Sequence, residues 1–215
     1  MYVSLTSRPG LAATANYFSQ FQACPNERHW VQLRRVLRYV KGTLNYGLVY
    51  EASIDGPMLE VYTDADWASD IVDRRSVSGA VFKLFGATVS WIAKKQATVS
   101  LSSTEAELVA LCKAACHGQW LIRVLKDLGL SVVEPVPFHE DNQSTIKIVS
   151  NPKDTGRLKH IDVKHFFVRD LVESGCIKVD YVPSAEQQAD ILTKSLPAPT
   201  FRRLRASLGL ADCSV

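Results

Sequence analysis

Apolar and polar residues alternate along five short stretches of the chain, the pattern of strands with one buried face. The first stretch is Met58–Asp64, and the next two, Val77–Phe85 and Ala87–Ala93, are separated by Gly86 alone. A glycine turn between two alternating runs indicates a hairpin, so we expect the first three strands to form an antiparallel meander. Two isolated strands are expected further along, at 136–141 and 177–182.

Between and after these strands the apolar residues recur at spacings of three and four, which indicates helices. The longest predicted helix covers 103–128 and ends before Gly129. Shorter helices are predicted at 142–150, 160–174, 184–193 and 200–208. A meander followed by alternating helices and strands predicts an α/β fold in which helices flank a mixed sheet.

The first part of the chain follows a different pattern, with helical spacing in 11–22 and again in 30–41, interrupted at Pro25-Asn26. The turn signal Asp55-Gly56-Pro57 then separates this part from the strands. We therefore predict a short helical N-terminal extension over residues 1–55 and a main domain over residues 56–210.

The composition of the chain excludes several classes of protein. The chain has 215 residues, of which 47% are hydrophobic and 22% charged, too apolar a balance for a disordered chain. Its start lacks the basic-then-apolar order of a signal peptide. No run approaches the length of a membrane span, and the five cysteines are irregularly spaced. We expect an intracellular protein, cytoplasmic or nuclear and not secreted, with no membrane partner and no disulfide framework.

The net charge of +3 is unevenly distributed, because residues 1–50 hold six basic side chains and one acid. Such an arm is typical of contact with a polyanion, although a solvated helix face gives the same pattern. The same helix carries Trp30, Leu33 and Leu37, whose apolar face would brace it against the main domain.

Two acids stand where predicted strands end. Asp64 ends the first strand and Asp141 ends the fourth. Ligands bind at strand ends in sheets of this kind, although Asp141 could also cap the following helix. A third acid, Asp190, lies in the predicted helix 184–193; taken alone, it would be a surface residue.

The long helix offers two glutamates that helical geometry separates. At about 100° per residue, Glu107 falls on the stripe of small and apolar side chains, whereas Glu105 falls on the polar face. Glu105 also follows Ser102 at the spacing of a capping box, which explains it without a function. A core-facing carboxylate requires a partner, and a cation suits Glu107 because its stripe holds no basic residue.

Four carboxylates without histidine or cysteine suit hard cations such as Mg²⁺ or Mn²⁺. Two such ions, held close together, clamp the attacking water and the leaving oxygen of a phosphodiester. The motifs around these acids resemble those of the ribonuclease H domain of copia-type retrotransposon Pol polyproteins. They are Tyr62–Trp67, Ser102–Leu108, Asp141–Ser144, Lys159–Asp162 and Ala189–Lys194.

The resemblance implies a ribonuclease H-like fold, a five-stranded mixed sheet with three antiparallel strands and then two parallel ones. It also implies a nuclease that cuts the RNA strand of RNA–DNA hybrids with two Mg²⁺ ions, for which Mn²⁺ can substitute. Carried over by motif, the metal ligands and catalytic residues are Asp64, Glu107, Asp141 and Asp190, with Asp64 shared by both ions.

Residues 1–50 resemble the end of the reverse transcriptase in the same polyproteins, through Thr6–Pro9 and His29–Gly42. The chain contains no Tyr-x-Asp-Asp polymerase motif, so we expect no DNA synthesis from it. Reverse transcriptase or other Pol parts are therefore expected partners. An inactive retroelement remnant that binds nucleic acid, or is only structural, is the alternative.

For the hybrid itself, Asn142 and Gln143 are placed to contact sugar hydroxyls, and Lys94 and Lys95 to contact phosphates. Many related ribonucleases H carry a histidine in the loop before the last acid. The corresponding loop here, Val182–Ala189, has none. His139 lies on the same strand face as Asp141, where it either approaches the site or packs as an ordinary core side chain.

Overall fold

The computed structural model describes residues 1–51, 56–151 and 162–214, and its centre is a five-stranded sheet in the order β4-β3-β2-β5-β6. Strands β2, β3 and β4 pair antiparallel, and β5 and β6 add to β2 in parallel. The predicted mixed sheet is confirmed. The strands are β2 (Leu59–Asp66), β3 (Val77–Leu84), β4 (Ala87–Lys95), β5 (Val136–Glu140) and β6 (Ile177–Tyr181).

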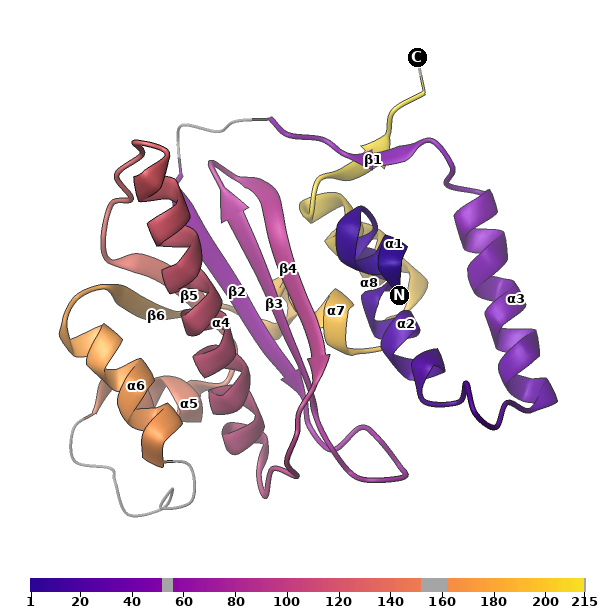
Figure 1. The fold of residues 1–215 in the computed structure, drawn as a ribbon, viewed down its shortest axis with the longest axis horizontal. Helices are drawn as coiled ribbons and strands as arrows, with labels where there is room; N and C mark the ends of the chain where they lie inside the picture. Colours follow the sequence, from indigo (N-terminus) through magenta and orange to yellow (C-terminus); the bar gives the residue numbers. More distant parts are fainter. Residues whose placement is uncertain (52–55, 152–161, 215) are drawn as a thin grey trace.

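One face of the sheet is covered by the long helix α4 (Ser103–Asp127), beside which lie α5 (Gln143–Ser150) and α6 (Asp162–Glu173) (Figure 1). Leu108 and Leu111 of α4 pack with Val61 and Phe138 of the sheet in the main core cluster. By length and composition α4 could also cross a membrane. Its buried stripe against the sheet is instead that of a core helix.

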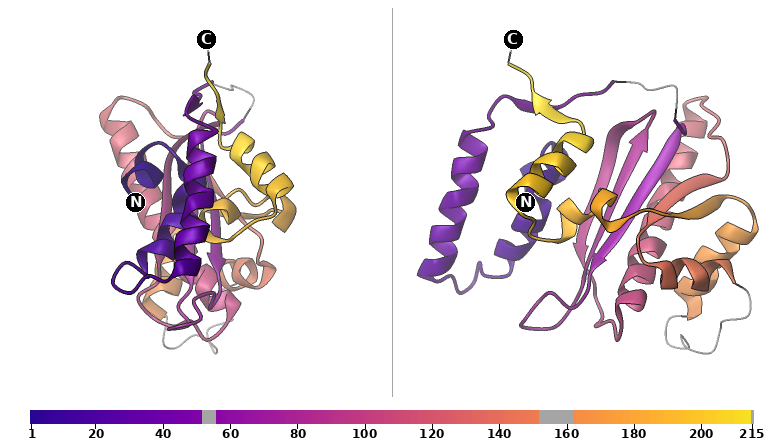
Figure 2. Two further views of the ribbon diagram at one scale, coloured as in Figure 1. Left: turned by 90° about the vertical axis from the view of Figure 1, so that its right-hand side faces the viewer. Right: turned by 180° about the vertical axis from the view of Figure 1, so that it is seen from behind.

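The opposite face is covered by α2 (Ala12–Ser19), α7 (Asp190–Thr193) and α8 (Ala198–Ser207), as Figure 2 shows from two further sides. Ala12, Ile191 and Leu204 join Val81 of β3 in a second core cluster. The predicted helix over 184–193 is wrong in its first half. A 3₁₀ turn at Ser184–Glu186 is followed by extended backbone at Gln187, because that side chain turns into the core.

The N-terminal extension joins the main domain through its first helices and a small added sheet. Trp91 of β4 donates its indole N–H to the carbonyl of Ser4, at 2.8 Å. Strands β1 (Tyr46–Leu48) and β7 (Leu210–Asp212) pair antiparallel, so the last part of the extension meets the C-terminal segment. The predicted boundary at Asp55 lies outside the described residues and stays a prediction. The remaining elements are α1 (Tyr2–Thr6), the 3₁₀ helix Pro9–Leu11 and α3 (Glu27–Lys41).

Helix α3 stands away from the sheet (Figure 1), and none of its residues is buried. Trp30 is 56% exposed and Leu37 55%, so the expectation that these side chains brace the helix on the main domain is wrong. The inner face of α3 contacts α2 rather than the sheet. Helix α2 and the turn before it dock the extension on the main domain, and α3 adds the ring contact of Tyr39 with Phe201 of α8, whose centroids lie 5.5 Å apart.

Candidate metal and nuclease site

The pairing of β2 with β5 brings two of the predicted acids together. These parallel strands pair Val61 with Phe138 and Tyr62 with His139. The same offset, continued two residues along, places Asp64 opposite Asp141 on the same face of the sheet. Asp64 is completely buried, and β2 continues two residues past it to Asp66, further than the alternation predicts.

Glu107 reaches the same point from the first turns of α4. Ala106 and Ala110 pack on Ala65 of β2, and these small side chains let the helix approach the strand end closely. One carboxylate oxygen of Asp64, Glu107 and Asp141 lies within 4.8 Å of the others. Oε2 of Glu107 is buried and has no hydrogen-bond partner among the described residues. Within the described part of the chain, this oxygen is therefore available to a ligand.

Asp190, the first residue of α7, is joined to the group through a lysine. Nζ of Lys194 lies 2.8 Å from Oδ1 of Asp190 and 3.0 Å from Oδ1 of Asp64. The hydroxyl of Thr193 donates to the other oxygen of Asp64. Asp190 thus lies beside the cluster of Asp64, Glu107 and Asp141, which we call the three-acid cluster, and is not part of it.

A fifth carboxylate, Glu140, was not predicted. It is fully buried on the α4 side of β5, where it accepts hydrogen bonds from the hydroxyl of Thr63 (2.9 Å) and the backbone N–H of Asn142 (3.0 Å). The alternation Val136, Phe138, Glu140 puts it on the core-facing side. The face argument that singles out Glu107 could therefore have found it.

Gln187 and Lys194 were also missed as site residues. The buried amide of Gln187 donates to the carbonyls of Thr63 and His139, at 2.8 and 3.3 Å, and so joins β2 and β5 just before their acids. No sequence signal marks this contact. Lys194, by contrast, stands four residues after Asp190, the spacing of a same-face ion pair on a helix.

Burial and mutual repulsion dominate the electrostatics of the site. Burial and the charge of Glu140 raise the pKa of Glu107 well above its usual value. Burial and the charge of Asp64 raise the pKa of Asp190 to about 7, and burial raises that of Glu140 to about 8. Burial lowers the pKa of Lys194, but the carboxylate of Asp64 more than reverses this and keeps the lysine charged.

This donor set fits a divalent cation with oxygen ligands. The three-acid cluster contributes carboxylates alone, and Glu107 supplies a buried oxygen that forms no hydrogen bond with any described residue. Hard ions such as Mg²⁺ and Mn²⁺ prefer such ligands. A bound cation would also relieve the repulsion that raises the pKa of Glu107.

Because these pKa values are raised, the metal-free protein is expected to lose stability as pH increases. Asp and Glu titrate near pH 4 in the unfolded chain, so between about pH 4 and 8 the folded state binds more protons. This contribution is complete below pH 4 and lost as pH rises through 7 and 8. Thermal melts in chelator between pH 5 and 9 measure it.

The control for this pH dependence is a pair of matched substitutions. Asp190→Asn should flatten the curve, whereas Asp180→Asn, at a solvent-accessible acid paired with Lys178 on β6, should leave it unchanged. A melting temperature that rises between pH 5.5 and 8.5 in chelator would contradict the expected repulsion.

Glu105 corrects part of the helix-face prediction. Its backbone N–H donates to the hydroxyl of Ser102, the N-cap, as the capping spacing predicts. Its side chain is not on the wet face, however, because Glu105 is only 5% exposed and accepts from the backbone N–H of Leu101 at 2.7 Å. The loop before α4 folds over it, which a helical wheel cannot represent.

The residues predicted to contact the hybrid differ in how far their side chains are already engaged within the protein. Asn142 caps α5, its Oδ1 accepting from two backbone N–H groups, and Gln143 beside it is exposed. Lys94 is exposed on β4, whereas Lys95 pairs with Asp70 and, at 3.0 Å, with Asp73. Their contacts with nucleic acid stay predictions. Residues 159–161 of the fourth motif lie outside the described residues.

His139 packs in the sheet surface rather than among the acids. Its ring stacks on Tyr62 with centroids 4.4 Å apart, and Nε2 lies 3.3 Å from a carboxylate oxygen of Glu60. This agrees with the interpretation of His139 as a packed side chain. Within the described residues, no histidine replaces the one missing from the loop before Asp190.

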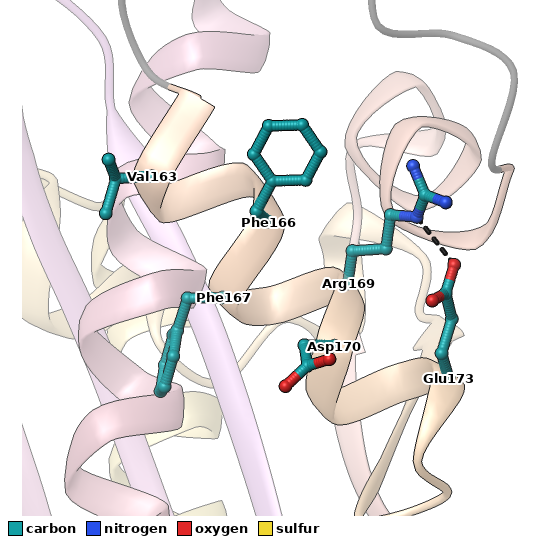
Figure 3. Close-up of a pocket in the computed structure, with 6 residues that line it drawn as sticks. All are labelled: Val163, Phe166, Phe167, Arg169, Asp170 and Glu173. Carbon is teal, nitrogen blue, oxygen red and sulfur yellow. Dashed lines mark hydrogen bonds and ion pairs between the residues drawn. The ribbon is translucent and has the colours of Figure 1, made fainter.

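A groove along α6 contains none of the predicted site residues (Figure 3). Arg169 and Glu173 form an ion pair of 2.6 Å at its side. Its lining combines apolar and charged side chains without a carboxylate cluster, so it is not a second candidate for the same chemistry. The residues that line the groove are Val163, Phe166, Phe167, Arg169, Asp170 and Glu173.

The chain is similar in sequence to known proteins. The chain is 37% identical over 210 residues to the retrovirus-related Pol polyprotein from transposon TNT 1-94 of Nicotiana tabacum, a match that spans 98% of the chain and 16% of the polyprotein. It is 48% identical over 121 residues, 56% of the chain, to a protein of Plasmopara viticola named secreted RxLR effector protein 161, and covers 84% of it. No protein-family model matches.

Among solved structures, the chain is similar to LC11-RNase H1, isolated from compost by a metagenomic approach. The TM-score is 0.50 at 15% sequence identity, over 64% of this chain and 94% of that one. This similarity confirms the predicted ribonuclease H-like fold. The chain spans about one sixth of the length of the tobacco polyprotein, a small part of a much longer protein.

Proposed function

Because the chain belongs to the retrovirus-related Pol polyproteins of copia-like transposons, we propose that it is their ribonuclease H, a metal-dependent nuclease that cuts the RNA strand of RNA–DNA hybrids. The observation that carries the proposal is the three-acid cluster at the adjoining ends of β2 and β5, with a buried oxygen on Glu107 that has no hydrogen-bond partner in the described part of the chain. Neither nucleophilic nor acid–base catalysis by a histidine or cysteine accounts for such a group.

In this proposal the four acids have distinct roles. Asp64, Glu107 and Asp141 would hold one cation, and Asp64 would share a second with Asp190. Two bound Mg²⁺ ions, or Mn²⁺ in their place, would activate the attacking water and stabilise the leaving oxygen. Gln187 keeps β2 and β5 together at the site, which preserves the spacing of Asp64 and Asp141.

Substrate binding would rest on backbone and sugar contacts, since cleavage of hybrids needs no base recognition. Exposed Gln143 and the amide nitrogen of Asn142 would meet sugar hydroxyls, and Lys94 and Lys95 would meet phosphates. The natural setting would be inside the cell, in a retroelement particle or the nucleus, beside reverse transcriptase and other Pol parts.

A labelled RNA–DNA hybrid tests the activity directly. With Mg²⁺, the purified chain should cut the RNA strand and leave the DNA strand and a DNA duplex intact. Excess chelator should abolish cleavage, because the carboxylates alone cannot activate water. Restored Mg²⁺ should also raise the melting temperature, since an ion that binds only the folded state stabilises it.

Two results would contradict the proposal in different ways. Equal cleavage in chelator would exclude the metal-dependent reaction. Binding of the hybrid without cleavage in Mg²⁺ or Mn²⁺ would support the alternative, an inactive retroelement remnant that retains nucleic-acid binding. A chain that neither binds nor cleaves would point to a purely structural remnant.

A further inference from the structure

Both oxygens of Asp64 are already engaged by two consecutive residues at the end of α7. Thr193 donates its hydroxyl to Oδ2, and Nζ of Lys194 lies 3.0 Å from Oδ1. Lys194 also lies 2.8 Å from Oδ1 of Asp190. Apart from Lys194, neither of these two Oδ1 atoms has a partner among the described residues. The lysine is therefore the counter-ion of two buried carboxylates at once.

The rest of the cluster has no such counter-ion. In the described part of the chain, no cationic side chain forms an ion pair with Glu107, Asp141 or Glu140. The site thus contains two different positions for positive charge. The one inside the three-acid cluster receives no cationic side chain from the described residues, and the one between Asp64 and Asp190 is filled by the ammonium group of Lys194.

We propose that Lys194 is a built-in cation that holds the Asp64–Asp190 position in the metal-free protein and competes there with a divalent ion. This inference rests on the proposed function, because the proposed nuclease reaction requires the divalent ion that would compete with Lys194. A divalent ion then enters the three-acid cluster first. The Asp64–Asp190 position fills second and only when Lys194 leaves, so Lys194 sets how tightly the second ion binds.

The side chain is suited to leave. Lysine carries a compact, strongly hydrated charge on a flexible four-carbon stem, so it can exchange a carboxylate for water. The side chain of Lys194 is already 33% exposed. It is tethered four residues from Asp190, which keeps it near both acids once displaced. A purely structural ion pair would need none of this access.

The test compares variants of the full chain by calorimetric titration with Mn²⁺ and by thermal melts in chelator. Lys194→Met removes the charge but keeps the stem, whereas Lys194→Arg keeps the charge. Lys178→Met is the matched control, since it removes a lysine that pairs with Asp180 at 2.7 Å, outside the cluster. Lys194→Gln serves as a second neutral variant should the methionine protein fail to fold.

We expect Lys194→Met to lower the dissociation constant of the second ion by about tenfold or more, because it removes a like charge a few ångströms away. The first ion should gain less. In chelator the same variant should melt below wild type, since two buried carboxylates lose their counter-ion. Lys194→Arg and Lys178→Met should leave the second dissociation constant near the wild-type value.

If the second ion binds no more tightly to the neutral variant that folds, Lys194→Met or Lys194→Gln, than to wild type, the inference is overturned and Lys194 is a structural ion pair. In that case wild type would still bind Mn²⁺ and the proposed function would stand. If wild type binds no divalent ion at all, the proposed function and the inference fail together. These outcomes separate the role of the lysine from the existence of the metal site.

Discussion

Glu107→Gln is expected to abolish cleavage of the hybrid while making the metal-free protein more stable. An amide is a poor ligand for Mg²⁺, so the substitution removes an oxygen of the three-acid cluster. The same change removes a carboxyl group whose charged form is disfavoured by burial and by the charges of Glu140 and Asp64. Each kcal/mol of repulsion relieved should raise the melting temperature in chelator by about 2–4 °C for a chain of this size.

Glu105→Gln is the matched control, because Glu105 lies on the same helix and is equally buried. Its carboxylate accepts a hydrogen bond from the N–H of Leu101, which an amide oxygen can also accept. The expected loss is limited to a capping contribution of about 0.5–2 kcal/mol, with cleavage retained. Loss of activity in Glu105→Gln but not in Glu107→Gln would exclude the assigned ligand set.

The strands and the faces on which single acids lie could be predicted from periodicity, whereas the parallel pairing and the convergence of the acids followed from the resemblance to ribonuclease H domains. Alternation in β2 and β5 fixes which side chains share a face, and parallel pairing then sets Asp64 beside Asp141. The apolar stripe of α4 selects Glu107 in the same way. These patterns relate residues only a few positions apart, so they can be recognised in a single sequence.

The contacts made by α7 could not be predicted, because they depend on packing between distant segments. Thr193 lies 129 residues from the Asp64 that it binds, and the amide of Gln187 lies 124 residues from the carbonyl of Thr63. The pairing of β1 with β7 likewise joins residues 46–48 to residues 210–212. The prediction for α3 failed for a related reason. An apolar stripe on a helix predicts that the stripe is buried, but it does not say against which element the helix packs.

Gly79 of β3 determines how closely α7 approaches the site. It pairs with Asp64 across the sheet. A Cβ atom at this position would lie 2.6 Å from the methyl carbon of Thr193 and 3.1 Å from the carbonyl oxygen of Ala189. Only glycine leaves room for the turn that carries Asp190 and Lys194 to rest directly on the strand.

Gly79→Ala is therefore expected to destabilise the protein by about 1–3 kcal/mol, the range for an added carbon in a tightly packed core. The collision with Thr193 must move α7 away from β3, and with it the side chains that bind Asp64. A displacement of about 1 Å in a catalytic group can lower activity about a hundredfold, so cleavage should fall more than stability alone explains.

Urea denaturation and hybrid cleavage of Gly79→Ala measure the two effects separately. Gly56→Ala is the control, because a Cβ atom there meets none of the described residues within 4 Å, so both quantities should stay at the wild-type values. If Gly79→Ala keeps wild-type stability and activity, α7 adjusts without cost and its contact with β3 does not position the site. If stability falls while cleavage of the folded fraction is unchanged, α7 supports the fold, but the spacing of Asp190 from Asp64 tolerates its movement. If cleavage falls by more than the fraction of folded protein does, the close approach of α7 to Gly79 holds Asp190 and Lys194 in position against Asp64.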